Sequence, residues 1–236
     1  MVTRSLLTHK IPRRLGNLAK ILDFDGIDDY VDCGNDASLS VTGDLTIEFY
    51  FKVHSLPSTV YKIVEKQWQE FAVKFDQNQK KIIFEHTGGE WEAIHPLVTD
   101  IQLNTWCHIA LTRDIENAQM RGYKNGVLDQ TKSFSETDIV SSTYPVLIGC
   151  EEQDRYWFDG EIALVRIYNR VLSASEVKRN YRSVLGNSDF VRDGLVLFLA
   201  PEGLNFGDNV WHDLSDYNNH GVIYGATLIF EKIGGG

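Results

Sequence analysis

The stretch that decides the fold is NTWCHIALTR, residues 104–113, followed about ten residues later by YKNGVLDQ, residues 123–130. Trp106–Arg113 is the clearest strand pattern in the chain. In the second segment, Asn125-Gly126 lies between two extended stretches, and this dipeptide favours the tight turn of a β-hairpin. The two segments together predict antiparallel β-structure.

Further strands are expected on both sides of this stretch. LTIEFYFKV, Leu45–Val53, alternates apolar and polar residues as a half-buried strand does. Turn signals recur every ~8–12 residues and helical patterns are almost absent, which predicts an all-β antiparallel sandwich. The other predicted strands cover Ile21–Val31 (interrupted by a turn), Ile63–Glu65, Glu70–Phe75, Lys81–His86, Val146–Cys150, Gly160–Tyr168, Gly194–Leu199 and Gly221–Phe230.

One short helix is predicted over residues 173–184. Ser173 can cap its first turn, and Glu176 occupies the third helical position, where its carboxylate can bond back to the cap. This capping box makes residues 173–184 the one helix that we predict for the chain.

The charge is unevenly distributed along the 236 residues. The net charge is −10, but residues 1–20 carry five basic side chains and no acid, so the remainder carries −10 − 5 = −15. An acidic body argues against nucleic-acid binding, which needs a basic face. The basic arm could contact an acidic partner, including a second copy of the chain, or it could be a solvated terminus. Its charged residues are Arg4, Lys10, Arg13, Arg14 and Lys20.

The cysteines and the apolar runs restrict the setting of the protein. Cys33, Cys107 and Cys150 cannot form a fully paired disulfide framework, and we expect Cys107 and Cys150 to be core residues. No run reaches the ~18 apolar residues of a membrane span. The N-terminus has charge but no apolar segment after it, so no secretory signal is expected.

Three pieces of sequence, in this order, resemble the LamG-like, concanavalin-type jelly-roll family. The first is LDFDGIDDYV, residues 22–31, followed by Leu39 and LTIEFYFKV; the second is NTWCHIALTR with YKNGV. The third is FDGEIALVRIYNRVLSASEVKRNY, residues 158–181. The resemblance covers roughly residues 20–182 and implies a lectin-like jelly roll.

The C-terminal part, residues 194–226, resembles the segment that usually begins such a domain. Either the domain is circularly permuted, with residues 194–231 completing the sandwich, or a second repeat begins here. We favour permutation, because a lone half-repeat would leave apolar strand edges exposed. The predicted division is a basic arm over residues 1–20 and one LamG-like domain over residues 21–236.

The resemblance also suggests a calcium site at the acidic turn after the first strand. The carboxylates of Asp25 and Asp28 and the Gly26 carbonyl are the oxygen ligands that Ca²⁺ prefers. Many family members place a further acidic residue after the Gly-x-Ile of the third piece, where this chain has Ala163 and Leu164. The alternative is that the acids only fix a tight turn through local hydrogen bonds.

Four aromatic residues among polar neighbours are the candidates for a glycan-binding or partner-binding rim. Sugar recognition needs aromatic faces beside polar groups, and Trp and Tyr are also enriched in protein contacts. Trp106, in contrast, belongs to an alternating strand and is expected in the core. The candidates are Trp68, Trp91, Tyr156 and Trp157.

Catalysis is not expected from this sequence. Glycosidases on lectin-like sandwiches need two carboxylates across a cleft, often as acids at alternate strand positions. Glu136 and Asp138 begin such a pattern, but Ser141 stands where the last acid should be. The two functions that remain are a structural or decorating protein of a virus particle or surface assembly, and a free-standing carbohydrate-binding module. The first predicts self-association and a virion or extracellular surface location.

Overall fold

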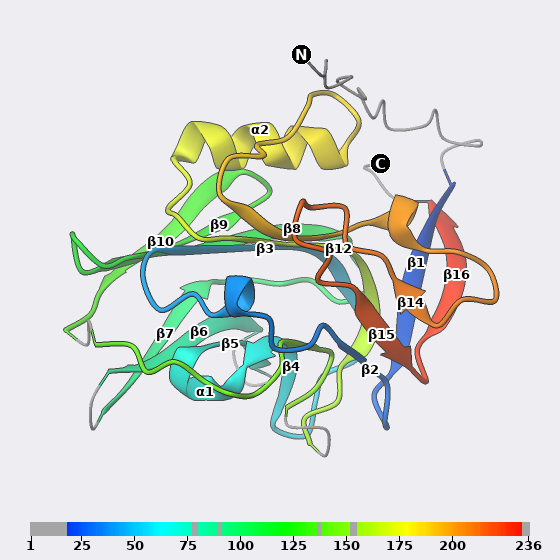
Figure 1. The fold of residues 1–236 in the computed structure, drawn as a ribbon, viewed down its shortest axis with the longest axis horizontal. Coiled ribbons are helices and arrows are strands. Elements are labelled where there is room, and N and C mark those ends of the chain that lie inside the picture. Colours follow the sequence, from blue (N-terminus) through cyan, green and yellow to red (C-terminus); the bar gives the residue numbers. More distant parts are fainter. Residues whose placement is uncertain (1–17, 77–79, 89–90, 136–137, 152–154, 233–236) are drawn as a thin grey trace, which may run out of the picture.

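The described residues of the computed structural model form two antiparallel sheets that face each other (Figure 1). These residues are 18–76, 80–88, 91–135, 138–151 and 155–232. Sheet A runs in the order β10 (Val127–Ser133), β9 (Gln119–Lys124), β8 (Cys107–Asp114), β3 (Leu45–Val53), β12 (Asp159–Tyr168), β1 (Leu18–Asp25) and β16 (Thr227–Lys232), and β13 (Leu195–Leu199) also pairs with β12. The all-β sandwich predicted from the sequence is confirmed.

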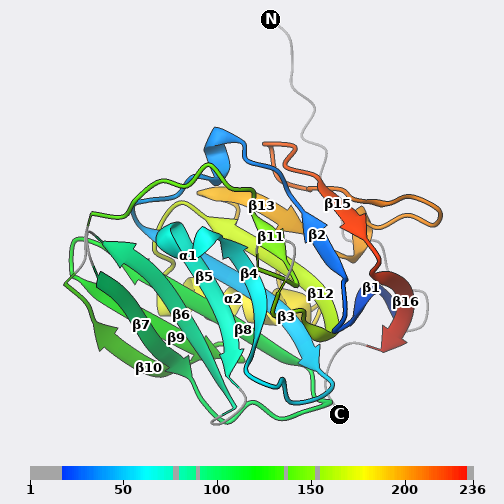
Figure 2. The same cartoon turned by 90° about the horizontal axis from the view of Figure 1, so that it is seen from below.

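Sheet B forms the second layer, which Figure 2 views from its outer side. Its order is β14 (Val210–Trp211), β15 (Gly221–Tyr224), β2 (Tyr30–Asp32), β11 (Leu147–Ile148), β4 (Val60–Lys66), β5 (Phe71–Asp76), β6 (Lys81–Gly88) and β7 (Trp91–Val98). The short helical elements are α1 (Gln67–Glu70), α2 (Ala174–Val184) and the 3₁₀ turns Ala37–Leu39 and Pro201–Gly203. None of the helices in the described part of the chain is long and apolar enough to cross a membrane.

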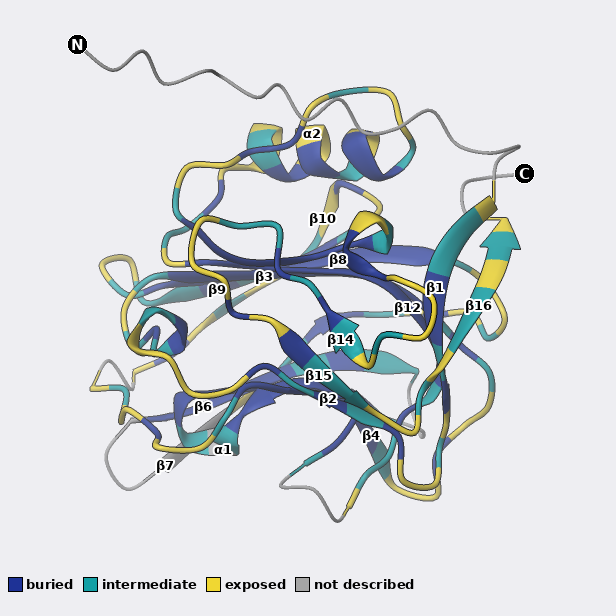
Figure 3. Ribbon diagram, turned by 45° about the vertical axis from the view of Figure 1, so that its right-hand side comes forward, coloured by how far each residue is buried: buried dark blue, intermediate teal, exposed yellow. Residues whose placement is uncertain are grey.

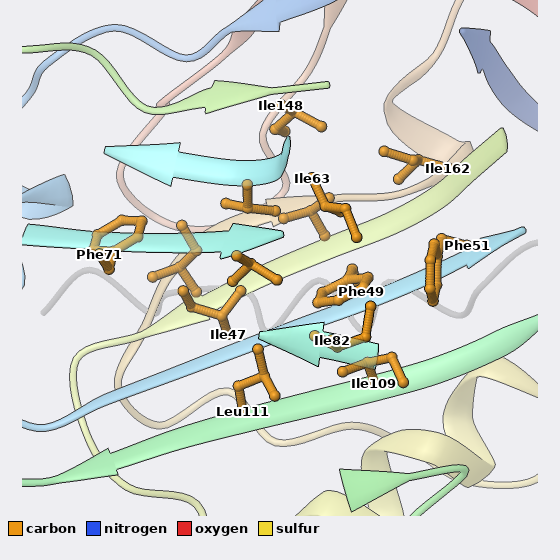
Figure 4. Packing of buried hydrophobic residues seen from close by; sticks show 14 of the residues in the cluster. Ile47, Phe49, Phe51, Ile63, Phe71, Ile82, Ile109, Leu111, Ile148 and Ile162 are labelled. Carbon is orange, nitrogen blue, oxygen red and sulfur yellow. The ribbon is translucent and has the colours of Figure 1, made fainter. Parts of the chain in front are cut away.

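The core lies between the sheets and follows from strand alternation. Ile47, Phe49 and Phe51 point from β3 toward sheet B, where they meet residues such as Ile63 and Ile82 (Figure 4). All of these side chains are fully buried. Burying one such side chain stabilises the fold by about 1.5–3 kcal/mol.

The outer face of sheet A is covered by α2, which begins as the sequence predicts. Ser173 and Glu176 form the capping box that was expected from the sequence. The side of the helix that faces sheet A is buried and the opposite side is exposed (Figure 3). Val177 and Val184 join a second apolar cluster with Tyr50 of the sheet.

The C-terminal strands join both sheets. β16 pairs with β1 in a register that sets Phe230 against Lys20, and β13 pairs with β12. β15 pairs with β2. Because these pairings cross from one end of the chain to the other, residues near the C-terminus complete faces that begin near residue 20. The domain division itself, including the circular permutation, stays a prediction.

Two expectations about individual segments need correction. Ile21–Val31 is not one interrupted strand in one sheet, because β1 belongs to sheet A and β2 to sheet B. Trp106 is only half-buried and lies outside the core between the sheets, where it stacks on Tyr50 with ring centroids 4.9 Å apart. Cys107 and Cys150 are buried in the core, as expected.

Candidate functional site

Three aromatic rings meet on the outer face of sheet B and form what we call the aromatic platform: Tyr30, Trp157 and Tyr224. The rings of Tyr30 and Tyr224 stack with centroids 4.5 Å apart and planes 9° apart. The ring of Trp157 lies 5.9 Å from that of Tyr30, tilted by 44°. Val31 and Ile223 pack into the core, so their strand neighbours Tyr30 and Tyr224 project outward.

Backbone hydrogen bonds hold Trp157 beside this pair. The N–H of Lys62 donates to the Tyr156 carbonyl, and the N–H of Phe158 donates to the Gly149 carbonyl. Phe158 is fully buried and anchors the segment in the core. The returning chain therefore runs alongside β4 and presents Trp157 on the outside of the sheet.

A polar hollow of about 430 Å³ adjoins the aromatic platform. Asp32 and Val222 are register partners that line it; Asp32 follows Tyr30 by two residues and Val222 precedes Tyr224 by two, a step of about 7 Å along each strand on the same face. Tyr217 is 49% exposed and lines both this hollow and a second one of about 270 Å³. The larger hollow is lined by residues 32–34, 36, 217–220 and 222.

The polar hollow offers both hydrogen-bond donors and acceptors. The N–H and Oγ of Ser38 donate to Asp36, which holds the pKa of this carboxyl below its ordinary value and keeps it anionic. His220 Nδ1 accepts the Asp213 N–H at 3.0 Å, so in the neutral ring Nε2 carries the proton. Asn219 is buried and donates to Ser38 Oγ, which ties the hollow to the loop before β3.

A buried ion cluster lies on the same face, beyond Trp157. Lys62 Nζ is 2.7 Å from Glu65 Oε2 and 3.7 Å from Glu85 Oε2, and Lys74 also pairs with Glu85. Burial raises the pKa of Glu65 to about 7, although Lys62 opposes the shift. The cluster links β4, β5 and β6, and both of its lysines are already paired with glutamates within the protein.

A family model for the concanavalin A-like lectin/glucanases superfamily matches residues 25–178. The chain belongs to this superfamily. The match confirms the resemblance carried by the three sequence pieces, and it covers both residues 30 and 157 of the aromatic platform. Tyr224 lies beyond the matched residues. A search of the curated proteins found no relative.

Solved structures with the superfamily's sandwich match the chain at low identity. A proposed carbohydrate-binding protein from Bacteroides ovatus matches with a TM-score of 0.72 and 17% identity, over 92% of this chain and 60% of that protein. The chain thus spans less than two thirds of that protein. The CBM40 of a Ruminococcus gnavus sialidase, bound to α2,3-sialyllactose, matches with a TM-score of 0.51 and 20% identity, over 68% of this chain and 96% of that protein. A heptameric pentraxin from Limulus polyphemus matches with a TM-score of 0.54 and 16% identity, over 69% of this chain and 82% of that protein.

The four aromatic residues singled out from the sequence fall at two ends of sheet B. Trp68 lies in α1, after the end of β4, and Trp91 begins β7 at the same end of the sheet; their side chains lie outside the described residues. Tyr156 and Trp157 lie beside the start of β4. Trp157 alone of the four joins the aromatic platform. Sequence reasoning missed Tyr30, Tyr217 and Tyr224.

The acidic turn between β1 and β2 is held by its own hydrogen bonds. Asp29 Oδ2 accepts the Asp25 N–H at 2.9 Å, and Asp25 Oδ1 accepts the Ile27 N–H at 2.8 Å. One carboxylate oxygen from each of Asp25, Asp28 and Asp29 lies within 4.8 Å of the others. Burial raises the pKa of Asp29. Calcium binding by Asp25, Gly26 and Asp28 stays a prediction.

Of the five basic residues assigned to the N-terminal arm, only Lys20 lies among the described residues. Arg4, Lys10, Arg13 and Arg14 lie outside the described residues. Lys20 does not belong to an arm, because β1 begins at Leu18 and the Lys20 ammonium donates to the Leu204 carbonyl. This lysine therefore belongs to sheet A.

Proposed function

We propose that this protein binds carbohydrate, without catalysis, through the aromatic platform and the polar hollow. The observation that carries the proposal is the joining of three outward rings to a polar depression on one face of sheet B. Sugars have apolar C–H faces and a hydroxyl rim. They therefore bind best where aromatic rings adjoin oriented polar groups.

The roles of the two parts differ. A pyranose ring stacks on Tyr224 and Trp157, which need little reordering because each of them already contacts the ring of Tyr30. Its hydroxyls reach the anionic Asp36, the Asn218 side chain and Tyr217 in the polar hollow. Asp32 Oδ1 already accepts the Gly34 N–H, so its other oxygen is the acceptor for a ligand.

The absence of catalysis is part of the proposal. The nearest buried acids on this face, Glu65 and Glu85, are paired with Lys62 and Lys74. Glycoside hydrolysis needs two carboxylates free to act on opposite sides of the glycosidic bond. Two of the similar structures are named for carbohydrate binding, which agrees with a binding role. At 17% and 20% identity, however, this similarity shows only that the fold is shared.

A structural role in a virus particle or surface assembly, with self-association through the arm, was the first prediction from the sequence. It stays a prediction, as does the virion or extracellular location, because most of the arm lies outside the described residues. No described feature favours this role over carbohydrate binding.

The test is a glycan array followed by calorimetry with the best ligand. We expect Trp157→Ala and Tyr224→Ala each to weaken binding at least ~10-fold, about 1.4 kcal/mol. The matched control is Phe206→Ala, which removes an aromatic ring that is 70% exposed and packs on Phe230 away from the hollow. Wild-type affinity in both platform variants, or an equal loss in Phe206→Ala, would overturn the proposal.

A further inference from the structure

A second group of ionisable residues lies on the outer face of sheet A, which the proposed glycan site does not use. Asp23 on β1 and Glu161 on β12 are register partners, and His54 follows the end of β3. Their strand neighbours Leu22 and Ile162 are core residues, so Asp23 and Glu161 point outward. Three adjacent strands thus bring one histidine and two acids together.

The distances within this group are short. His54 Nε2 lies 3.0 Å from Glu161 Oε1, and His54 Nδ1 lies 3.4 Å from Asp159 Oδ1 and 3.9 Å from Asp23 Oδ1. One ligand atom each from Asp23, His54 and Glu161 falls within 4.8 Å of the other two. The side chains of Asp23 and His54 are partly exposed, so the group is open to solvent on one side.

An independent observation at the floor of the group points to a missing cation. Glu161 is only 5% exposed; its Oε1 pairs with Lys52 Nζ at 2.8 Å, but among the described residues its Oε2 finds no hydrogen-bond donor. The buried Oε2 of Glu231, next to Lys52, is in the same condition. A buried carboxylate oxygen without a donor is unfavourable, because it has lost its hydration without gaining a hydrogen bond.

The charges around Glu161 favour the same conclusion. Two carboxylates, those of Glu161 and Glu231, pair with the Lys52 ammonium, and two more, those of Asp23 and Asp159, lie beside His54, so carboxylates outnumber the lysine by three. Burial raises the pKa of Asp23. The nearby His54 opposes this shift, and the carboxylates of Glu161 and Asp159 add to it. A divalent cation would relieve this crowding.

We propose that Asp23, His54 and Glu161 bind a divalent transition-metal ion of the Zn²⁺ class. Imidazole nitrogen with carboxylate oxygen is a ligand set that zinc accepts, whereas Ca²⁺ prefers oxygen alone. Zinc–ligand bonds of about 2.0–2.2 Å set neighbouring ligand atoms roughly 3.3 Å apart in a tetrahedron. The 3.0 Å between His54 Nε2 and Glu161 Oε1 is close to this spacing, and a ligand atom of Asp23 lies within 4.8 Å of one from each of these two residues.

Asp159 has a supporting role in this arrangement. With Nε2 on the metal, His54 Nδ1–H points at Asp159 Oδ1, the hydrogen bond that commonly orients a metal-binding histidine. The metal would connect β1 and β12 with the end of β3, so its binding should raise the melting temperature. Water completes the coordination on the exposed side.

The experiment is calorimetric titration of the full chain with ZnCl₂ after treatment with EDTA and dialysis. We expect one Zn²⁺ per chain, and at least ~10-fold weaker binding in His54→Ala and in the isosteric Glu161→Gln. Circular dichroism checks that both variants fold. In the same titration with CaCl₂, we expect no saturable binding that depends on His54; any Ca²⁺ binding should be the same in the wild type and in His54→Ala.

The matched control is His212→Ala, because His212 pairs with Asp208 at 2.9 Å and is similarly exposed but lies outside the group. It should bind Zn²⁺ like the wild type, and so should Trp157→Ala, which separates this site from the glycan site. Unchanged Zn²⁺ affinity in both His54→Ala and Glu161→Gln, or loss of binding in His212→Ala alone, would overturn the proposal.

Discussion

The outer faces of sheets A and B differ in what packs on them. On sheet A, α2 packs over the strands and fully buries Asn180, which donates to Glu48 Oε2 at 2.8 Å and to the Tyr168 hydroxyl at 3.0 Å. On sheet B, pairing of β2 with β15 leaves Tyr224 44% exposed. Both faces alternate with core residues along their strands. What separates a stabilising face from a binding face is the element that covers it.

Each face nevertheless buries a glutamate. Burial raises the pKa of Glu48 beneath α2 to about 7, against the attraction of Arg166, and it raises the pKa of Glu65 on sheet B to about 7, against Lys62. Neither lysine nor arginine fully repays the loss of hydration. Both faces therefore carry a proton that folding takes up near neutral pH.

The largest expected effect comes from opening the covered face. Asn180→Ala removes the donor to Glu48 and Tyr168 and the acceptor of the Val191 N–H, so we expect a loss of about 3 kcal/mol in the free energy of unfolding. Urea denaturation measures it. Lys178→Ala, on the exposed side of α2, should change stability by less than about 0.5 kcal/mol.

The Asn180→Ala variant, measured under conditions where it is folded, should bind the glycan with the wild-type affinity. The hydrogen bonds of Asn180 lie on the opposite face of the sandwich from the aromatic platform. A loss in stability below about 1 kcal/mol, or a parallel loss of glycan affinity, would contradict the separation of the two faces.

A smaller effect concerns the pH dependence of stability. Glu48 has a pKa of about 7 when folded and an ordinary value near 4.5 when unfolded. Between these values the folded chain holds a proton that the unfolded chain has released, so stability contributed by Glu48 falls as pH rises through this window. Glu48→Gln cannot titrate. It should gain on the wild type by on the order of 1–3 kcal/mol between pH 4.5 and 7.5.

Urea midpoints at several pH values test this difference, with the exposed Glu116→Gln as control. A constant difference between wild type and Glu48→Gln over the whole range would show that Glu48 does not take up a proton on folding.

The smallest effect is expected at the turn that joins the two sheets. Asp25 and Asp29 accept the turn's backbone N–H groups, so Asp28→Asn should change stability by less than about 0.5 kcal/mol without metal. If the calcium prediction is right, millimolar Ca²⁺ raises the melting temperature of the wild type and not of Asp28→Asn. Equal melting temperatures of the wild type with and without Ca²⁺ would refute it.

Local signals account for most of what could be predicted. Asn125 and Gly126 both have positive φ angles and join β9 to β10 as a hairpin, and Ser173 caps α2 as its spacing to Glu176 indicates. These features depend on residues close together in the chain. The strand alternation of Leu45–Val53 likewise gives the core face of β3 directly.

The sites depend on register between distant segments and could not be predicted. Nothing near Tyr30 in the sequence indicates that Tyr224 will stack on it, since the contact exists only because β15 pairs with β2. Glu161 and Asp23 meet for the same reason. In WCHIALTR both alternating sets contain apolar residues, so the pattern there does not say which face is the core, and Trp106 points to the outer face.

The most direct test of the account is an NMR titration of the labelled protein with the best glycan from the array. We predict that chemical-shift changes concentrate on Tyr30, Trp157, Tyr224 and residues 217–220, and that resonances of α2 stay in place. Changes centred on α2 or on the face around Glu161, with the aromatic platform unaffected, would contradict the claim that sheet B carries the binding site.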